Sequence, residues 1–406
     1  MIPGIGWVQV GAANKTGPIA VVQWLVLSAV WSFKFGQQSP QKFPTNLYHC
    51  SMTIKRYFAL AALLLSLSPV WGQSPVEKIQ HLLDTFSFPS PEMGVSIGLV
   101  IGGESHFFHR GYTDQSQQRR VDEQSIFEIG SITKLFTGYL VAQAVTEGQW
   151  TLTDPIDTYL PDTLHLHPDI QNYISISDLA SHQSGLTELD LGALVQVNPK
   201  QPFNEVSLAA IDQILRTCEG LPNYGSYRYS NLSYILLGQL LEQRYAQSYA
   251  NLLKTKILVP ARMERTLTTD YDVPNRTSGY NAAGVLQDFF EWNLSAPCGL
   301  IKSSAADLTR FLRHFLLVRT GDPGQANRLL ETVYFKNAFI ELGLGLNILR
   351  DERGTVYAKS GDSFGQSSVL AYDPVQNWGL VILTTRADPT ARTLYDHIYR
   401  QILSGK

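Results

Sequence analysis

The sequence predicts an α/β fold, a sandwich of one antiparallel sheet with flanking helices plus an inserted, mainly helical subdomain. Strand-like segments occur near residues 93–110 and again at 355–385, whereas helix-like segments punctuated by Pro, Gly and Asn fill the middle of the chain. One sheet built from both chain ends, with the helical stretch inserted between them, is the simplest assembly. The chain has 406 residues, 44% of them hydrophobic, which is enough for such a core.

The first part of the α/β unit, residues 73–150, contains a predicted hairpin and a predicted helix. Residues 93–101 alternate and are rich in β-branched side chains, and Gly102-Gly103 provides a turn before a partner strand at 104–110. Residues 132–146 have helical periodicity, which predicts a helix with one apolar side that ends at Gly148.

The middle and the end of the chain differ in character. Helix-like stretches at 177–181, 208–218 and 232–245 predict that residues 151–295 form the helical insert. The α/β part then resumes over residues 296–406. Its predicted elements are a helix capped by Ser303-Ser304, strands at 355–359, 367–372 and 379–385, and a closing helix at 391–403.

Residues 52–72 are predicted to be a signal peptide. Two basic residues precede an apolar run at 57–67, and a cleavage-site pattern at 70–72 would leave Gln73 as the mature start. The alternative is an uncleaved anchor that keeps the protein at the membrane, although the run is shorter than the ~20 residues of a spanning helix. We interpret residues 1–51 as lying upstream of the true start at Met52; the rival is a leader formed by residues 19–31. Either way the expected location is periplasmic or secreted.

Composition excludes several classes of function. The formal net charge is −3 and no dense Lys/Arg run occurs, so nothing points to a nucleic-acid partner. The mature chain keeps Cys218 and Cys298, which we expect to be free, buried thiols rather than a disulfide. No cysteine or histidine spacing fits a metal site, so we predict neither a metal nor an organic cofactor. The sequence does not indicate an oligomeric state.

The first candidate for chemistry is Ser131-Ile132-Thr133-Lys134. A Ser and a Lys three residues apart on a helix share one face, and a desolvated lysine can take the proton of a serine that becomes a nucleophile. The spacing alone proves little, since Ser39 and Lys42 repeat it around a proline. In isolation a helix N-cap is the commoner role for such a serine.

Two further motifs follow in the chain. Tyr229-Ser230-Asn231 precedes a predicted helix; a tyrosine flanked by cations would relay protons, and the asparagine would hold Lys134 and a substrate amide. In isolation, a buried tyrosine and a helix-capping asparagine are the commoner roles for these two residues.

Lys359-Ser360-Gly361 ends a predicted strand and would bind a substrate carboxylate. Gly361 allows a close approach, and the N–H of Asp362 would form an oxyanion hole with that of Ser131. The alternative for this motif is a lysine at a strand end before a turn.

In this order and on these elements, the three motifs resemble the penicillin-recognising serine hydrolases: β-lactamases, penicillin-binding proteins and related esterases. The Tyr in the middle motif is similar to the class C branch. The resemblance implies a β-lactamase/transpeptidase-like fold, with Ser131 as nucleophile, Lys134 as its proton partner, Tyr229 as general base and acid, and Lys359 with Ser360 as the carboxylate site. It covers most of residues 93–388, in the blocks FEIGSITKLFTG, GQWTLTDPIDTYLP, LASHQSGL, GSYRYSNLSYILLG and CGLIKSSAADLTRF and in residues 359–374.

By this resemblance the expected function is a D-Ala-D-Ala carboxypeptidase or endopeptidase acting on cell-wall peptide. The alternatives are a class C β-lactamase, a carboxylic esterase, or a penicillin-recognising receptor with little turnover. Two departures weaken the β-lactamase alternative: residues 187–190 lack the glutamine of class C enzymes, and Cys298 stands where a small residue is usual. His182 is outside the three motifs, and we expect it to be a satisfied histidine at a helix-to-loop junction.

Overall fold

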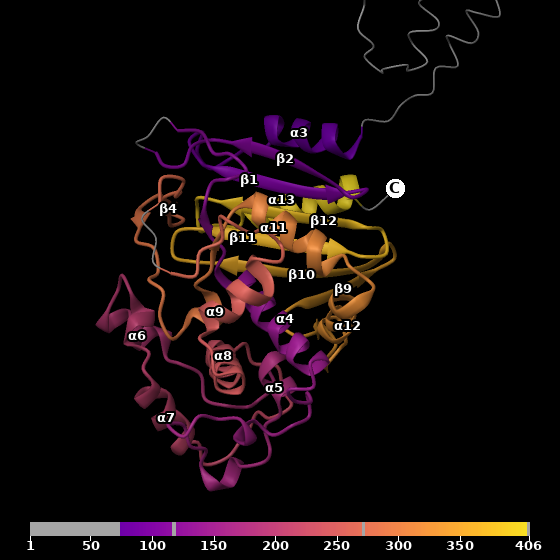
Figure 1. Ribbon diagram of the computed structural model, residues 1–406. Coiled ribbons are helices and arrows are strands. Elements are labelled where there is room, and N and C mark those ends of the chain that lie inside the picture. The colour runs from indigo at the N-terminus through magenta and orange to yellow at the C-terminus, as the bar shows by residue number, and fades with distance from the viewer. Residues whose placement is uncertain (1–73, 116–118, 270–272, 404–406) are drawn as a thin grey trace, which may run out of the picture. The chain divides into compact units, whose positions relative to one another are not determined.

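One antiparallel sheet drawn from both ends of the chain organises the computed structural model, which describes residues 74–115, 119–269 and 273–403. Among these residues the sheet has the strand order β2-β1-β12-β11-β10-β9-β8-β7 (Figure 1). The N-terminal hairpin therefore pairs directly with the last strand, which confirms the predicted assembly from both chain ends. The strands are β1 (Val95–Ile101), β2 (Glu104–Arg110), β7 (Phe335–Lys336), β8 (Glu341–Leu342), β9 (Asn347–Asp351), β10 (Gly354–Asp362), β11 (Ser367–Asp373) and β12 (Trp378–Thr384).

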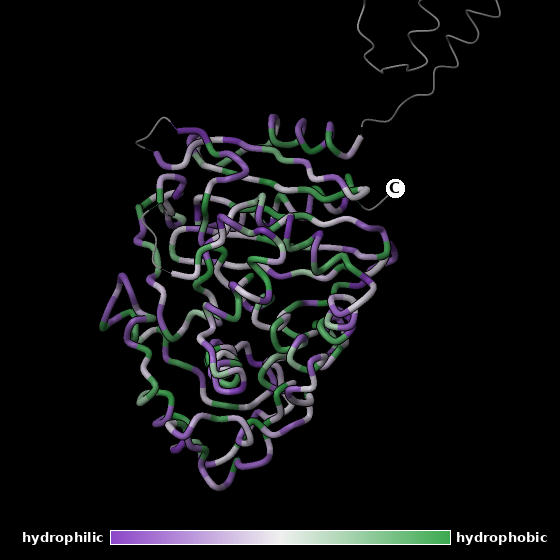
Figure 2. The backbone as a smooth tube through the Cα atoms, viewed as in Figure 1, coloured by the Kyte–Doolittle hydropathy of each residue, from purple (hydrophilic) through white to green (hydrophobic). Residues whose placement is uncertain are grey.

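The two faces of the sheet pack against different sets of helices. Along β12, Leu380 and Ile382 join the core under α3 (Pro75–Thr85) and α13 (Thr390–Ile398), while Val381 and Leu383 join the core on the other face. This alternation follows from the two-residue period of a strand. Figure 2 shows α3 hydrophobic toward the sheet and hydrophilic outward, which is the pattern expected of a covering helix.

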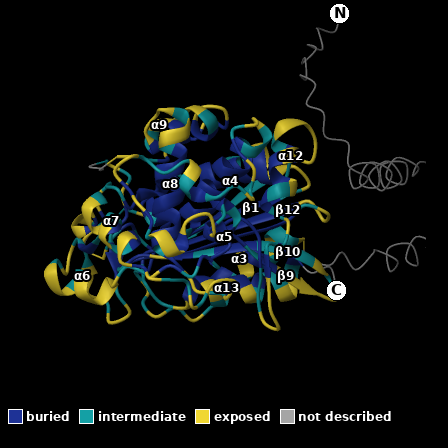
Figure 3. Ribbon diagram, turned by 90° about the horizontal axis from the view of Figure 1, so that it is seen from below, coloured by how far each residue is buried: buried dark blue, intermediate teal, exposed yellow. Residues whose placement is uncertain are grey.

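Helix α4 (Thr133–Thr146) is buried on all sides, which corrects the expectation of one apolar side. The helix is enclosed because α8 (Asn231–Tyr245), α10 (Ala296–Gly299) and α12 (Gly321–Leu330) pack around it. Figure 3 shows α4 and α8 as dark-blue, buried helices inside a more exposed periphery. The sequence periodicity was a poor guide here because apolar residues occupy every face of a central helix.

The stretch between the two halves of the sheet is mostly helical. It also contains a short hairpin whose strands have two residues each. That residues 151–295 form an insert with these boundaries stays a prediction. Within the described residues, no helix combines the length and apolarity that crossing a bilayer requires. The helices of this stretch are α5 (Ile176–Ala180), α6 (Leu191–Val197), α7 (Leu208–Arg216), α8 and α9 (Tyr249–Leu253), and the hairpin strands are β4 (Gly279–Tyr280) and β5 (Leu286–Gln287).

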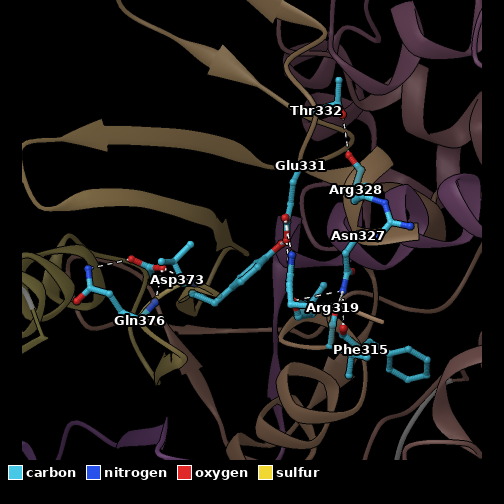
Figure 4. A network of polar contacts seen from close by, with 12 residues as sticks. Phe315, Arg319, Asn327, Arg328, Glu331, Thr332, Asp373 and Gln376 are labelled. Carbon is cyan, nitrogen blue, oxygen red and sulfur yellow. Dashed lines mark hydrogen bonds and ion pairs between the residues drawn. The ribbon is translucent and has the colours of Figure 1, made fainter. Parts of the chain in front are cut away.

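Two side-chain arrangements anchor the helices that follow. Ser304 caps α11 (Ala305–Phe311) by accepting a hydrogen bond from Asp307 N, close to the cap expected from the sequence. Glu331, just after α12, accepts two bonds from Arg319, of 2.7 and 3.0 Å, and one of 3.1 Å from Tyr372 of β11. Figure 4 shows this network, which ties α12 to the sheet.

Two other expectations concern the termini and the cysteines. The predicted signal peptide and the residues upstream of it lie outside the described residues. Cys218 and Cys298 are free, buried thiols, which confirms the expectation that they do not form a disulfide.

Candidate active site

Ser131 lies on a short 3-10 turn (Gly130–Ile132) that leads into α4. This turn packs closely against the end of β10. A Cβ atom added to Gly130 would lie 2.7 Å from Asp362 N, which is closer than a Cβ and a nitrogen approach each other in proteins. Gly130 also has φ +48°, in the left-handed region that glycine adopts readily. A glycine immediately before the serine therefore allows Ser131 to approach the β10 backbone.

The structure brings Ser131, Lys134 and Tyr229 together. A hydrogen bond of 2.7 Å joins Tyr229 Oη to Ser131 Oγ, and Lys134 Nζ donates to the same oxygen at 3.3 Å. Ser131 and Tyr229 are 98 residues apart in the chain. The sequence order of the motifs therefore corresponds to a real cluster in space.

Lys134 is fully buried and has a complete set of acceptors. Its ammonium donates to Ser131 Oγ, to Asn231 Oδ1 at 2.8 Å and to the Cys298 carbonyl at 2.6 Å. An ammonium has three protons, so each is directed at one oxygen. As an ammonium, Lys134 donates to Ser131 and has no lone pair to offer it.

Tyr229 lies just before α8, whose N-cap is Ser230 rather than the asparagine. Asn231 is the first helical residue, and its side chain holds Lys134 as predicted. Burial alone would raise the pKa of Tyr229, but the charges of Lys134 and Lys359 outweigh it and hold that pKa below 10.0. The two ammonium groups lie 4.8 Å from the centre of the phenol ring.

Lys359 belongs to β10, which continues to Asp362; this corrects the prediction that the strand ends at the lysine. The extra residues pair with β11, where Gly361 faces Ser368 and Asp362 faces Ser367. The Lys359 side chain is buried, and burial lowers its pKa below the usual 10.5, with Tyr229 opposing the shift and Lys134 adding to it. Ser360 is half-buried on the same strand.

The backbone of Gly361 and Asp362 passes directly beside Ser131. A Cβ on Gly361 would lie 2.8 Å from Ser131 N, so a glycine here lets β10 pass close to the serine, whereas the predicted close approach to a ligand stays a prediction. The two N–H groups expected to form an oxyanion hole therefore belong to adjacent backbones. The Asp362 side chain turns away to accept a bond from Ser367 Oγ at 2.8 Å and to pair with Arg392 of α13.

Sequence reasoning missed three contributors to this site. Arg392 reaches the end of β10 from the last helix, and no sequence pattern connects the two. Glu188 Oε1 accepts the N–H of Leu232 at the start of α8, although residues 187–190 were considered only for substrate recognition. His182 is not satisfied as expected, because its Nε2 is buried without a hydrogen-bond partner among the described residues.

A cavity of about 350 Å³ opens beside Tyr229. Its walls come from the loop after α5 and from the segment before α8, including Glu188 and Arg228. Tyr229 lines this cavity, whereas Ser131, Lys134 and Lys359 are not among its lining residues.

Comparison with known sequences decides the family. The family model described as Beta-lactamase matches residues 89–403, which is most of the chain. The chain belongs to the Beta-lactamase family. The match spans all three motifs, and the antiparallel sheet with its flanking helices is the β-lactamase/transpeptidase-like fold that the resemblance implied.

The individual relatives of this Beta-lactamase family chain have low sequence identity to it. Protein flp of Staphylococcus aureus strain MW2 is 25% identical over 345 residues, covering 81% of this chain and 66% of that protein. The chain thus spans just under two thirds of that relative. A Beta-lactamase of Psychrobacter immobilis is 26% identical over 249 residues, covering 58% of this chain and 55% of that protein.

Solved structures share the fold of this Beta-lactamase family chain. The Beta-Lactamase/D-Alanine Carboxypeptidase of Pseudomonas syringae superposes with a TM-score of 0.67 at 20% identity, covering 80% of this chain and 98% of that one. The octameric penicillin-binding protein homologue of Pyrococcus abyssi gives a TM-score of 0.65 at 24% identity, covering 75% and 72%.

Proposed function

We propose that the chain is an exported serine hydrolase that forms an acyl-enzyme on Ser131. The observation that carries this proposal is the hydrogen bond of 2.7 Å between Ser131 Oγ and Tyr229 Oη, beside a Lys134 whose protons are all engaged. A serine needs a base to become a strong nucleophile. Because Lys134 as an ammonium can only donate, and because the charges of Lys134 and Lys359 lower the pKa of Tyr229, we assign Tyr229 as that base.

The reaction proceeds in two halves. Ser131 Oγ attacks the substrate carbonyl while Tyr229 Oη takes its proton, and the N–H groups of Ser131 and Asp362 bind the resulting oxyanion. Tyr229 then returns the proton to the leaving group, which departs and leaves an ester on Ser131. In the second half, water attacks that ester and gives a proton to Tyr229, which passes it to Ser131 Oγ as the ester bond breaks, and the acid product is released.

The proposed substrate is a cell-wall peptide that ends in D-Ala-D-Ala, cleaved by carboxypeptidase- or endopeptidase-like action. Lys359, a buried cation next to Tyr229, and the neighbouring Ser360 would bind the terminal carboxylate of such a peptide. The structural neighbours from Pseudomonas syringae and Burkholderia cenocepacia, the latter a D-alanine carboxypeptidase, support the same class. A β-lactam fits less well, because Glu188 occupies the region where class C enzymes carry an amide.

Export is part of the proposal. Residues 73–406 form a compact unit. Removal of the predicted signal peptide after Gly72 would therefore leave the catalytic unit whole, in the periplasm or outside the cell. Sequencing the N-terminus of the secreted protein tests this step, and a mature product that retains residues 1–51 would contradict it.

The activity is tested by incubating residues 73–406 and the Ser131→Ala variant with a labelled penicillin, an activated ester and an acyl-D-Ala-D-Ala peptide. Intact mass follows the adduct, and chromatography follows the products. Release of D-Ala supports the peptidase, rapid drug hydrolysis indicates a β-lactamase, and a long-lived adduct indicates a receptor. Preferential cleavage of the activated ester indicates a carboxylic esterase. Equal activity in the Ser131→Ala protein would exclude the mechanism itself.

A further inference from the structure

One histidine is bonded to both neighbours of the catalytic tyrosine. The His182 carbonyl accepts the N–H of Arg228 at 2.9 Å, and His182 Nδ1 accepts the N–H of Ser230 at 3.1 Å. Between these two bonds the imidazole lies against the Tyr229 ring, with 4.5 Å between the ring centres and 37° between the planes. His182 thus contacts Tyr229 and fixes the backbone on either side of it.

The backbone of His182 is in an unfavourable conformation. Its φ is +62°, in the left-handed region that residues other than glycine adopt uncommonly, although Asn, Asp and His do so more often than most, at a cost of about 1 kcal/mol. Gly, Asn and Asp adopt this region more readily. The conformation directs the imidazole into the protein, where only 3% of the residue is exposed.

The imidazole also leaves one hydrogen bond unmade. Because Nδ1 accepts from Ser230, the ring proton of neutral His182 is on Nε2, which is buried without a partner among the described residues. A residue in the left-handed region that also contacts a candidate catalytic group is a position where function can account for the unusual backbone.

The groups around the ring keep it neutral. The tyrosines at 227, 229 and 234 pack against it, and the ammonium groups of Lys134 and Lys359 lie close enough to repel a positive charge. Burial, and then these two cations, lower the pKa of His182 well below 6.5. A neutral ring is required for the observed geometry, because a protonated Nδ1 would face the Ser230 N–H as a second donor.

We propose that His182 is a positioning residue for Tyr229. By bonding residues 228 and 230 and packing on the ring between them, it holds the phenol oxygen at 2.7 Å from Ser131 Oγ and keeps the ring near both ammonium groups. This inference rests on the proposed function for its catalytic meaning. The placement of the phenol is a claim of its own, which a measurement without substrate can test.

The test compares two variants of residues 73–406. His182→Ala removes the ring and the acceptor, whereas His182→Asn keeps a residue that tolerates positive φ and has an oxygen near the position of Nδ1. His109→Ala on β2, which removes an imidazole bonded to Ser96, is the matched control. Thermal unfolding and circular dichroism give the folded fraction of each protein.

Two readouts decide the outcome. Acylation of Ser131 by an activated ester should slow about 100-fold in His182→Ala, since a displacement near 1 Å has that effect, and should largely recover in His182→Asn. The phenolate absorbance of Tyr229, isolated by subtracting the Tyr229→Phe spectrum, should titrate closer to 10.0 in His182→Ala than in the wild type.

The two proposals fail in different ways. If the His182→Ala protein titrates like the wild type, or loses activity only in proportion to its folded fraction, the positioning role is overturned. If the wild type forms no adduct on Ser131, the proposed function fails, while the titration still decides whether His182 places the phenol.

Discussion

The sharpest prediction concerns Tyr229→Phe, which removes one oxygen and leaves the ring in place. That oxygen is 2.7 Å from Ser131 Oγ, and among the described residues the other side chain bonded to Ser131 Oγ is that of Lys134, whose ammonium also donates to Asn231 and to the Cys298 carbonyl. A positioned general base contributes about 10²–10⁴-fold. Because Lys134 has no free lone pair to replace it, we expect acylation to slow about 10³-fold, or ~4 kcal/mol.

The measurement is the rate of adduct formation on Ser131 with a labelled penicillin or an activated ester, followed by stopped flow and by intact mass. Tyr227→Phe is the matched control, because Tyr227 also packs against His182 and its ring contacts Phe335. The control should acylate at nearly the wild-type rate. If Tyr229→Phe acylates normally while Lys134→Met does not, the base is Lys134 and the reasoning from its three acceptors is wrong.

Three further predictions follow from the same contacts. The acylation rate should have a bell-shaped pH profile. It should fall on the acid side as Tyr229 gains a proton, with a midpoint below 10.0, and on the alkaline side as Lys359 loses a proton, with a midpoint below 10.5. An acid midpoint at 10.0 or above would contradict the role of the two cations. Glu331→Ala should cost about 2 kcal/mol in urea unfolding, because it removes the charged hydrogen bonds to Arg319; an unchanged unfolding midpoint would show that this network adds nothing. Glu188→Ala should lower the thermal midpoint by removing an acceptor at the start of α8, at a cost of about 1 kcal/mol, whereas Glu188→Gln, which keeps an oxygen, should stay close to the wild type.

The sequence was sufficient for the parts of the fold that depend on local pattern. The hairpin at β1 and β2 was predicted because alternation and a Gly-Gly turn are local signals, and its second strand matches the prediction residue for residue. The burial of α4 was not predicted, because one sequence cannot tell that helices from distant segments surround it. Likewise the continuation of β10 to Asp362 depends on pairing with β11.

The candidate site also contains residues that the sequence identifies and contacts that only the folded chain reveals. Ser131, Lys134 and Tyr229 were recognisable because each belongs to a short motif on a predictable element. The bond of Glu188 to the start of α8 and the pairing of Arg392 with Asp362 join segments that share no motif, so only the folded chain reveals them. For His182 the sequence predicts only a structural role, since neither its positive φ nor its two hydrogen bonds to the neighbours of Tyr229 can be inferred from residue order.

Tyr229 and Lys134, the two described side chains that are hydrogen-bonded to Ser131 Oγ, differ in solvent exposure and therefore in role. Lys134 is completely buried, whereas Tyr229 is 40% exposed. The second half of the proposed reaction needs a water molecule from solvent, and a base that borders solvent is within reach of its proton. Tyr229 is therefore placed to serve both halves, while Lys134 supplies a fixed charge that orients Ser131 and Asn231 and favours the phenolate. It follows that loss of Lys134 should impair catalysis partly through Tyr229, so the effects of the two substitutions should not add.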